Sequence, residues 1–150
     1  MAPRRELPPA AGAYPAPLLA ELARLCEETP DRERCGFVVR EGEGGPLAAV
    51  PLPNVSPEPD AFTIDPLAHL RLAKRLRAGG GQVVAVWHSH VDAPAVLSAR
   101  DREGAAPDGV EAIPGAEQLV LGLRAGRVVE IRRFVPVEGG FAEGSIRYSG

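Results

Sequence analysis

The stretch Val83-Val84-Ala85-Val86-Trp87-His88-Ser89-His90 decides how the rest of this sequence is interpreted. Five apolar residues lead into two histidines at positions i and i+2, which is typical of a buried β-strand with a polar end. Because alternate side chains of a strand share a face, we expect His88 and His90 to point to one side and Ser89 to the other. Two imidazoles on one face suggest part of a metal site.

A second polar pattern, Ser98-Ala99-Arg100-Asp101, follows after seven residues. Taken alone it predicts a helix capping box, with Ser98 as the N-cap. Such a cap would fix the start of a helix and thereby aim Asp101 back at the end of the strand. Two imidazoles and a carboxylate are ligands that zinc prefers, and a catalytic zinc keeps a fourth position for water.

The composition is that of a globular domain and gives no sign of binding to nucleic acid or membranes. The chain has 150 residues, of which 45% are hydrophobic and 25% charged, and this predicts one domain. Its net charge of −3 gives no reason to expect nucleic acid or an anionic membrane as a partner. No apolar run is long enough for a membrane span, and prolines interrupt the stretch that a signal peptide would need. We therefore expect a cytoplasmic protein, with Cys26 and Cys35 as reduced thiols.

The expected fold class is α/β in the mixed α+β sense, a single domain with a mixed β-sheet packed between helices. Residues 1–16 predict a flexible Pro-rich tail, 17–137 the domain, and 138–150 a polar C-terminal tail. Apolar periodicity and caps predict helices at 17–28, 66–78 and 98–104. Turn residues and alternation predict strands at 35–40, 47–53, 61–64, 83–90, 117–124 and 128–134.

The predicted helix 66–78 carries an apolar stripe and a basic face. The stripe consists of Leu67, Leu70, Ala73 and Leu76. Its basic residues are interpreted as a solvated face. His69, on the same helix, is interpreted as a packing or surface residue, not as a metal ligand.

Other metal hydrolases share only part of the pattern. His88-x-His90-x-Asp92 begins like the metallo-β-lactamase motif, but Ala93 stands where that motif has histidine. The three histidines of the chain are too few for that class or for the amidohydrolases. The Pro-Cys-x-x-Cys of zinc deaminases and the His-Glu-x-x-His of zincins are absent.

The complete pattern, His88-x-His90, seven residues, then Ser98-x-x-Asp101, resembles the JAMM signature H-x-H-x7-S-x2-D of the JAB/MPN-domain metalloproteases. Glu33-Arg34-Cys35-Gly36 stands where that family often carries Glu-x-Cys-Gly. Segments 54–57 and 62–66 resemble the stretch before the second helix of bacterial members, so the resemblance covers roughly residues 18–135. Many members have proline at the positions of Val91 and Leu97, a difference that loosens the loop but deletes no ligand.

The resemblance implies a zinc metallopeptidase with one Zn²⁺ per chain and a role for each matching residue. The zinc ligands would be His88, His90 and Asp101. Glu33, which alone predicts only a surface carboxylate, would be the general base, and Ser98 would donate a hydrogen bond to the oxyanion. Cys35 is interpreted as a packed strand residue and Trp87 as core or pocket wall.

The resemblance also implies a substrate. The bond would follow the C-terminal Gly-Gly of a ubiquitin-like or sulfur-carrier protein, whose extended tail would pair with a sheet edge. Two alternatives stay open. One is a metal hydrolase of small peptide or amino-acid conjugates, and the other is a non-catalytic MPN scaffold that binds partners, although relatives of that kind lack the ligands present here.

Overall fold

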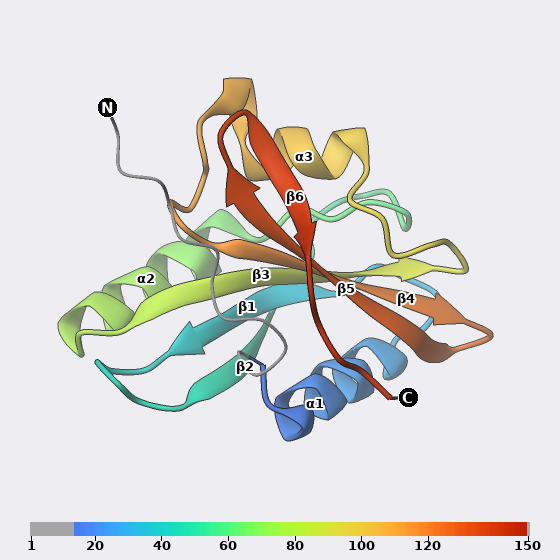
Figure 1. Ribbon diagram of the computed structural model, residues 1–150, viewed down its shortest axis with the longest axis horizontal. Coiled ribbons are helices and arrows are strands. Elements are labelled where there is room, and N and C mark those ends of the chain that lie inside the picture. Colours follow the sequence, from blue (N-terminus) through green and yellow to red (C-terminus); the bar gives the residue numbers. More distant parts are fainter. Residues whose placement is uncertain (1–13, 150) are drawn as a thin grey trace.

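The apolar run that ends in the two histidines forms β3 (Gln82–Val91), a central strand of a six-stranded mixed sheet. The computed structural model describes residues 14–149 (Figure 1). The strand order is β2-β1-β3-β4-β5-β6, in which only β3 and β4 are parallel. The other strands are β1 (Cys35–Arg40), β2 (Leu47–Leu52), β4 (Glu117–Arg124), β5 (Arg127–Val137) and β6 (Gly140–Gly144). The predicted mixed α+β class is confirmed.

Helix α1 (Ala16–Glu27) covers one face of the sheet (Figure 1). Its buried leucines and Cys26 recur at spacings of three and four, so one stripe of the helix meets the sheet. Trp87 is fully buried on this face, and its Nε1 donates a hydrogen bond to the Phe37 carbonyl at 3.1 Å. Cys26 and Cys35 are buried free thiols, and burial raises the pKa of each to about 12. Cys35 is thus packed rather than activated.

Helix α2 (Pro66–Ala78) covers the opposite face and begins as predicted. Asp65 is the N-cap and accepts from the Leu67 amide at 3.1 Å, with proline at the first helical position. The predicted apolar stripe was wrong in part, because Leu72 and Leu76 are buried whereas Leu67 and Leu70 are each 51% exposed. At about 100° per residue, Leu67 and Leu70 point well away from the face that Leu72 and Leu76 share.

The short helix α3 (Ala99–Ala105) lies above the same face as α2, over a third apolar cluster (Figure 1). That cluster comprises Ala95, Leu97, Val120, Phe134 and Phe141. The prediction of a polar tail after residue 138 was wrong for the part that forms β6, where Phe141 is only 9% exposed. A single apolar side chain gave too weak an alternation to indicate a strand, and pairing with β5 supplies the rest.

The chain ends and the predicted strand 61–64 also differ from expectation. Residues 1–13 of the predicted tail lie outside the described residues, but Tyr14 is buried in the α1 core and the helix starts at Ala16. The predicted strand 61–64 is reduced to a single bridge between Asn54 and Ile64. No helix in residues 14–149 is both long and apolar enough to cross a membrane.

Candidate metal centre

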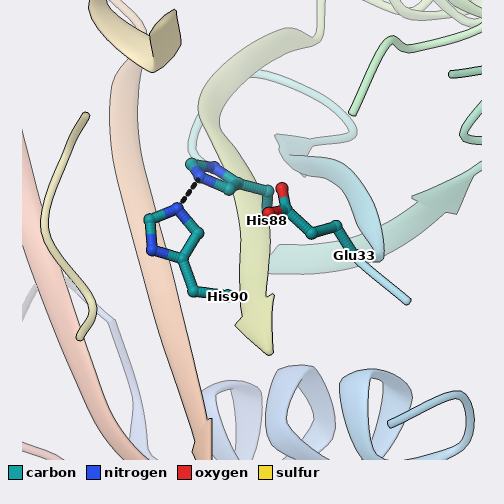
Figure 2. A group of neighbouring side chains, drawn as sticks. All are labelled: Glu33, His88 and His90. Carbon is teal, nitrogen blue, oxygen red and sulfur yellow. Dashed lines mark hydrogen bonds between the residues drawn. The ribbon is translucent and has the colours of Figure 1, made fainter. Parts of the chain in front are cut away.

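His88 and His90 lie near the carboxyl end of β3 and point to the face covered by α2 and α3, as Figure 2 shows for their two rings. Their Nε2 atoms are 3.1 Å apart. Ser89 points to the other face, where its Oγ accepts a hydrogen bond from the Arg34 backbone amide at 2.8 Å. The alternation predicted from the sequence is confirmed, and it brings two imidazole nitrogens to one point.

Asp101 reaches the same point from the first turn of α3. The capping box is present, because Ser98 Oγ accepts from the Asp101 amide at 3.0 Å and Asp101 Oδ2 accepts from the Ser98 amide at 3.1 Å. The same Oδ2 lies 3.2 Å from His88 Nε2 and 3.1 Å from His90 Nε2. The cap therefore positions the carboxylate, as the sequence predicted.

Glu33 approaches from the segment just before β1, and its carboxylate is directed toward the two histidines (Figure 2). The side chain is only 7% exposed, and its oxygen and the two imidazole nitrogens all lie within 4.8 Å of one another. Its backbone is held at both polar groups. The amide donates to the Pro59 carbonyl at 3.1 Å, and Asn54 Nδ2 donates to the Glu33 carbonyl at 2.9 Å.

Asn54 organises the loop that faces Glu33. Besides its bond to Glu33, Nδ2 donates to the Ala61 carbonyl at 3.1 Å, and Oδ1 accepts from the Ser56 and Thr63 amides at 3.0 Å each. One side-chain amide thus uses both donors and accepts twice. The sequence analysis noted this residue only as part of a family-like segment, and the signal available was an Asn ahead of a proline-punctuated loop.

The residues present fit a zinc ion. A tetrahedral zinc with bonds of 2.0–2.1 Å has ligand atoms about 3.3 Å apart. The mutual distances among His88 Nε2, His90 Nε2 and Asp101 Oδ2 are 3.1–3.2 Å, close to one face of that tetrahedron. Glu33, His88 and His90 form a second, looser group of candidate ligands. The closer group leaves Glu33 beside the centre, outside the set of three.

The protonation states of His88 and Asp101 suit metal binding. Burial lowers the pKa of His88, which favours the neutral imidazole. Burial would raise the pKa of Asp101, but hydrogen bonds from His88 and His90 outweigh it and hold that pKa well below its usual range. Neutral histidine and ionised aspartate are the forms that bind a metal. For His90, burial is outweighed by the Asp101 hydrogen bond and the pKa is raised, so a proton balances the carboxylate when no cation does.

The two histidines are oriented differently. His90 Nδ1 lies 2.8 Å from the Pro94 carbonyl, which can only accept, so Nδ1 carries the proton and Nε2 faces the centre. His88 Nδ1 is the one buried side-chain nitrogen or oxygen without a hydrogen-bond partner among the described residues. The His88 ring instead stacks on Phe62, with ring centroids 4.3 Å apart and an angle of 22°.

The loop between His90 and Ser98 is anchored although prolines are missing at Val91 and Leu97. The Ala95 amide donates to Glu130 Oε1 at 2.7 Å, and Asp92 Oδ1 accepts from the Ala125 amide at 3.0 Å. Hydrogen bonds to the β4–β5 hairpin thus hold the loop in place of the prolines.

The remaining two predicted residues, Glu33 and Ser98, line the same cavity as His90 and Asp101. Burial, reinforced by Asp101 and opposed by His90, raises the pKa of Glu33 to about 7, which suits a base at neutral pH. Ser98 Oγ accepts in the capping box, but its hydroxyl keeps a hydrogen to donate.

This cavity of about 320 Å³ gives access to the centre. It is lined by Glu33, Asp60, His90, Val91, Ala93, Ser98, Arg100 and Asp101. Sequence analysis missed Asp60 and Arg100, which carry no motif of their own.

Comparison with known proteins supplies the family. Residues 15–134 match the family described as prokaryotic homologs of the JAB domain. The chain belongs to this family. The resemblance inferred from the JAMM pattern is thereby confirmed, and the matched residues include Glu33, both histidines, Ser98 and Asp101.

Two curated proteins resemble this JAB-domain chain over part of their length. A probable TtuB-protein conjugate cleaving protease of Thermus thermophilus is 39% identical over 89 residues, 58% of this chain and 58% of that protein. A desampylase of Haloferax volcanii is 33% identical over 78 residues, 51% of this chain and 56% of that protein. The chain thus spans somewhat more than half the length of these curated relatives.

Solved structures share the fold. The solution structure of protein DSY2949 from Desulfitobacterium hafniense matches with a TM-score of 0.66 at 24% identity and covers 89% of each chain. That of a protein from Salinibacter ruber matches with a TM-score of 0.56 at 21% identity, over 90% of this chain and 89% of that one.

Proposed function

We propose that this JAB-domain chain is a zinc-dependent metallopeptidase that hydrolyses a peptide or isopeptide bond with one Zn²⁺ per chain. One observation carries the proposal. Two imidazole nitrogens and one carboxylate oxygen converge at 3.1–3.2 Å from one another, with a second buried carboxylate beside them. The full ligand set also speaks against a purely scaffolding role.

Each residue has a defined task in this mechanism. His88, His90 and Asp101 would hold the ion, and bound zinc would supply a water whose pKa is lowered to about 7. Glu33 accepts the proton of the attacking water at its carboxylate and returns it to the leaving amine. Ser98 donates its hydroxyl hydrogen to the oxyanion of the tetrahedral intermediate.

The substrate we propose is a conjugate of a ubiquitin-like or sulfur-carrier protein, cut after its C-terminal Gly-Gly. The names of the two curated relatives support this choice, since one is named for cleaving TtuB–protein conjugates and the other as a desampylase. A flexible glycine tail can also reach a centre whose zinc ligands are 0–11% exposed at their side chains.

A cleavage comparison tests this function. Purified wild-type protein loaded with zinc is incubated with a carrier-protein conjugate and, separately, with short peptides. We expect cleavage of the conjugate, one zinc per chain, and loss of both in His88→Ala. His69→Ala, which removes the third histidine of the chain, should keep its zinc. Cleavage of short peptides alone would favour the small-conjugate alternative, and full turnover by His88→Ala would contradict the mechanism.

A further inference from the structure

Beside the candidate metal centre, a second cavity of about 270 Å³ opens between α2, the end of α3 and the sheet. Its floor is buried and formed by Phe37, Val86 and Gln118. Exposed residues, among them Thr63 and Ala112, form its rim. No Asp, Glu, Lys or Arg lines it, so the cavity favours an apolar occupant.

The floor of this cavity also holds a polar group without a partner. Gln118 on β4 is 5% exposed, and its side-chain amide makes no hydrogen bond to another residue in the part of the chain that the structure describes. His88 Nδ1 is the one fully buried unpartnered side-chain nitrogen or oxygen among the described residues, so the Gln118 amide must be open to the cavity rather than sealed in the core. The Gln118 amide offers both a donor and an acceptor, which are the two groups that a peptide unit presents. Mostly apolar walls with a few polar groups, here Gln118, His69 and Thr63, are typical of a ligand pocket.

The cavity adjoins the candidate metal centre. Phe62 lines the cavity and stacks on His88, so one ring belongs to both. Val86 on the floor lies two residues before His88 on the same face of β3, about 7 Å along the strand. An extended substrate segment that runs along β3 has the same rise per residue as the strand. When its scissile bond lies at His88, the side chain in the cavity therefore belongs to a residue about two or three positions away from that bond.

We propose that this cavity is a specificity pocket for an apolar side chain of the substrate polypeptide. Because Gly-Gly fills the two positions before the bond that is cut, this side chain belongs to the third residue before the bond or to the second or third residue after it. Gln118 would hydrogen-bond a backbone peptide group of the bound segment. The role of the pocket in choosing substrates rests on the proposed peptidase function. Binding of a ligand in the pocket does not, and it can be measured in protein without activity.

The first test uses metal-free protein and needs no catalysis. Proton–nitrogen NMR spectra are followed during titration with N-acetyl-leucine methylamide and, as a matched probe, N-acetyl-glycine methylamide. We expect saturable shifts of the Gln118 side-chain amide with the leucine probe and at least tenfold weaker binding of the glycine probe. Equal binding of both probes, or no shift at Gln118, would overturn the proposal.

Variants make the binding test specific. Ala112→Phe fills the pocket from its exposed rim and should abolish the leucine-dependent shifts. Val110→Phe is the matched control, because Val110 lies on the same loop, is 71% exposed and does not line the cavity. Gln118→Met removes the amide at similar length and should weaken binding about five- to tenfold. Unchanged binding by Ala112→Phe would contradict the assigned site.

The second test measures selection by the zinc-loaded protein. Conjugates carrying Leu, Ser or Asp at each of the three positions on either side of the bond are compared by kcat/KM. We expect Leu to be preferred at one position by about tenfold or more, with the preference reduced in Ala112→Phe and kept in Val110→Phe. Cleavage without a preference at any position would contradict the specificity pocket but not the proposed peptidase function. If nothing is cleaved, the peptidase proposal fails and the probe titration decides on the pocket.

Discussion

Two clusters of buried polar side chains lie on opposite faces of the sheet, and they differ in how their charge is balanced. On the α1 face, Arg133 Nε and Nη2 donate to the two Glu117 oxygens at 2.7 and 2.8 Å. Tyr14 donates to the same carboxylate at 2.6 Å. Every charge in this cluster has an opposite charge in direct contact, and it acts as a closed structural unit.

On the other face, Glu33, His88, His90 and Asp101 gather without a bonded arginine or lysine in the described part of the chain. Only a proton on His90 balances the Asp101 carboxylate when no cation is bound. No Lys or Arg among the described residues hydrogen-bonds to either carboxylate, and Arg100 pairs instead with Glu58 at 2.8 Å. The His88 ring keeps one buried nitrogen without a partner. The first cluster is balanced by its own charges, whereas the second has the residues that fit a bound cation.

The largest difference between the two clusters should appear in the activity of a variant at Glu33, the proposed general base. Glu33→Gln removes proton transfer but keeps size and burial, so kcat should fall by about 10²- to 10⁴-fold. The zinc content, measured by mass spectrometry, should stay at one per chain, because Glu33 lies outside the closer ligand group. If zinc is lost together with activity, Glu33 is a ligand, and the looser group of Glu33, His88 and His90 is the metal site.

The matching change on the α1 face should affect stability and nothing else. Arg133→Met leaves Glu117 buried without its cation, which costs about 3–5 kcal/mol of unfolding free energy. Urea denaturation measures the loss, and the zinc content of the folded fraction should be unchanged. The double variant with Glu117→Gln should recover part of the loss. A fall in zinc content with Arg133→Met would mean that the two clusters are not separate.

A smaller effect should appear in the pH dependence of the metal-free protein. The pKa of Glu33 is raised from its ordinary 4.5 to about 7 by burial first, so folding favours the protonated form. The contribution to stability is fully present below about pH 4.5 and is lost as the pH rises through 7, by about 3 kcal/mol at most. Urea denaturation at pH 5 and pH 8 should show Glu33→Gln gaining stability relative to wild type at the higher pH. Parallel curves would contradict the raised pKa.

Local spacing explains which parts of the site were predictable from sequence. The period-two geometry of a strand joins His88 to His90, and the capping box joins Ser98 to Asp101, so both pairs follow from short-range rules. Glu33 lies more than fifty residues away from this pattern, and nothing local distinguishes it from a surface carboxylate. Its assignment rested on family resemblance.

Tertiary contacts explain what was missed. Tyr14 and Glu117 are 103 positions apart, so their hydrogen bond has no local signal. Which face of α2 is buried depends on the residues that the sheet presents to it. Leucine is also common on exposed helix faces, so Leu67 and Leu70 did not mark the buried side. The strand β6 forms because β5 offers it an edge, while its own five residues contain one large apolar side chain.

The most direct test of the central claim is anomalous diffraction at the zinc edge from crystals of the zinc-loaded wild-type protein. We predict one peak per chain, about 2.0–2.2 Å from His88 Nε2, His90 Nε2 and an Asp101 carboxylate oxygen, with Glu33 outside bonding distance. No peak at this centre, or a zinc bound by Glu33 in place of Asp101, would contradict the account.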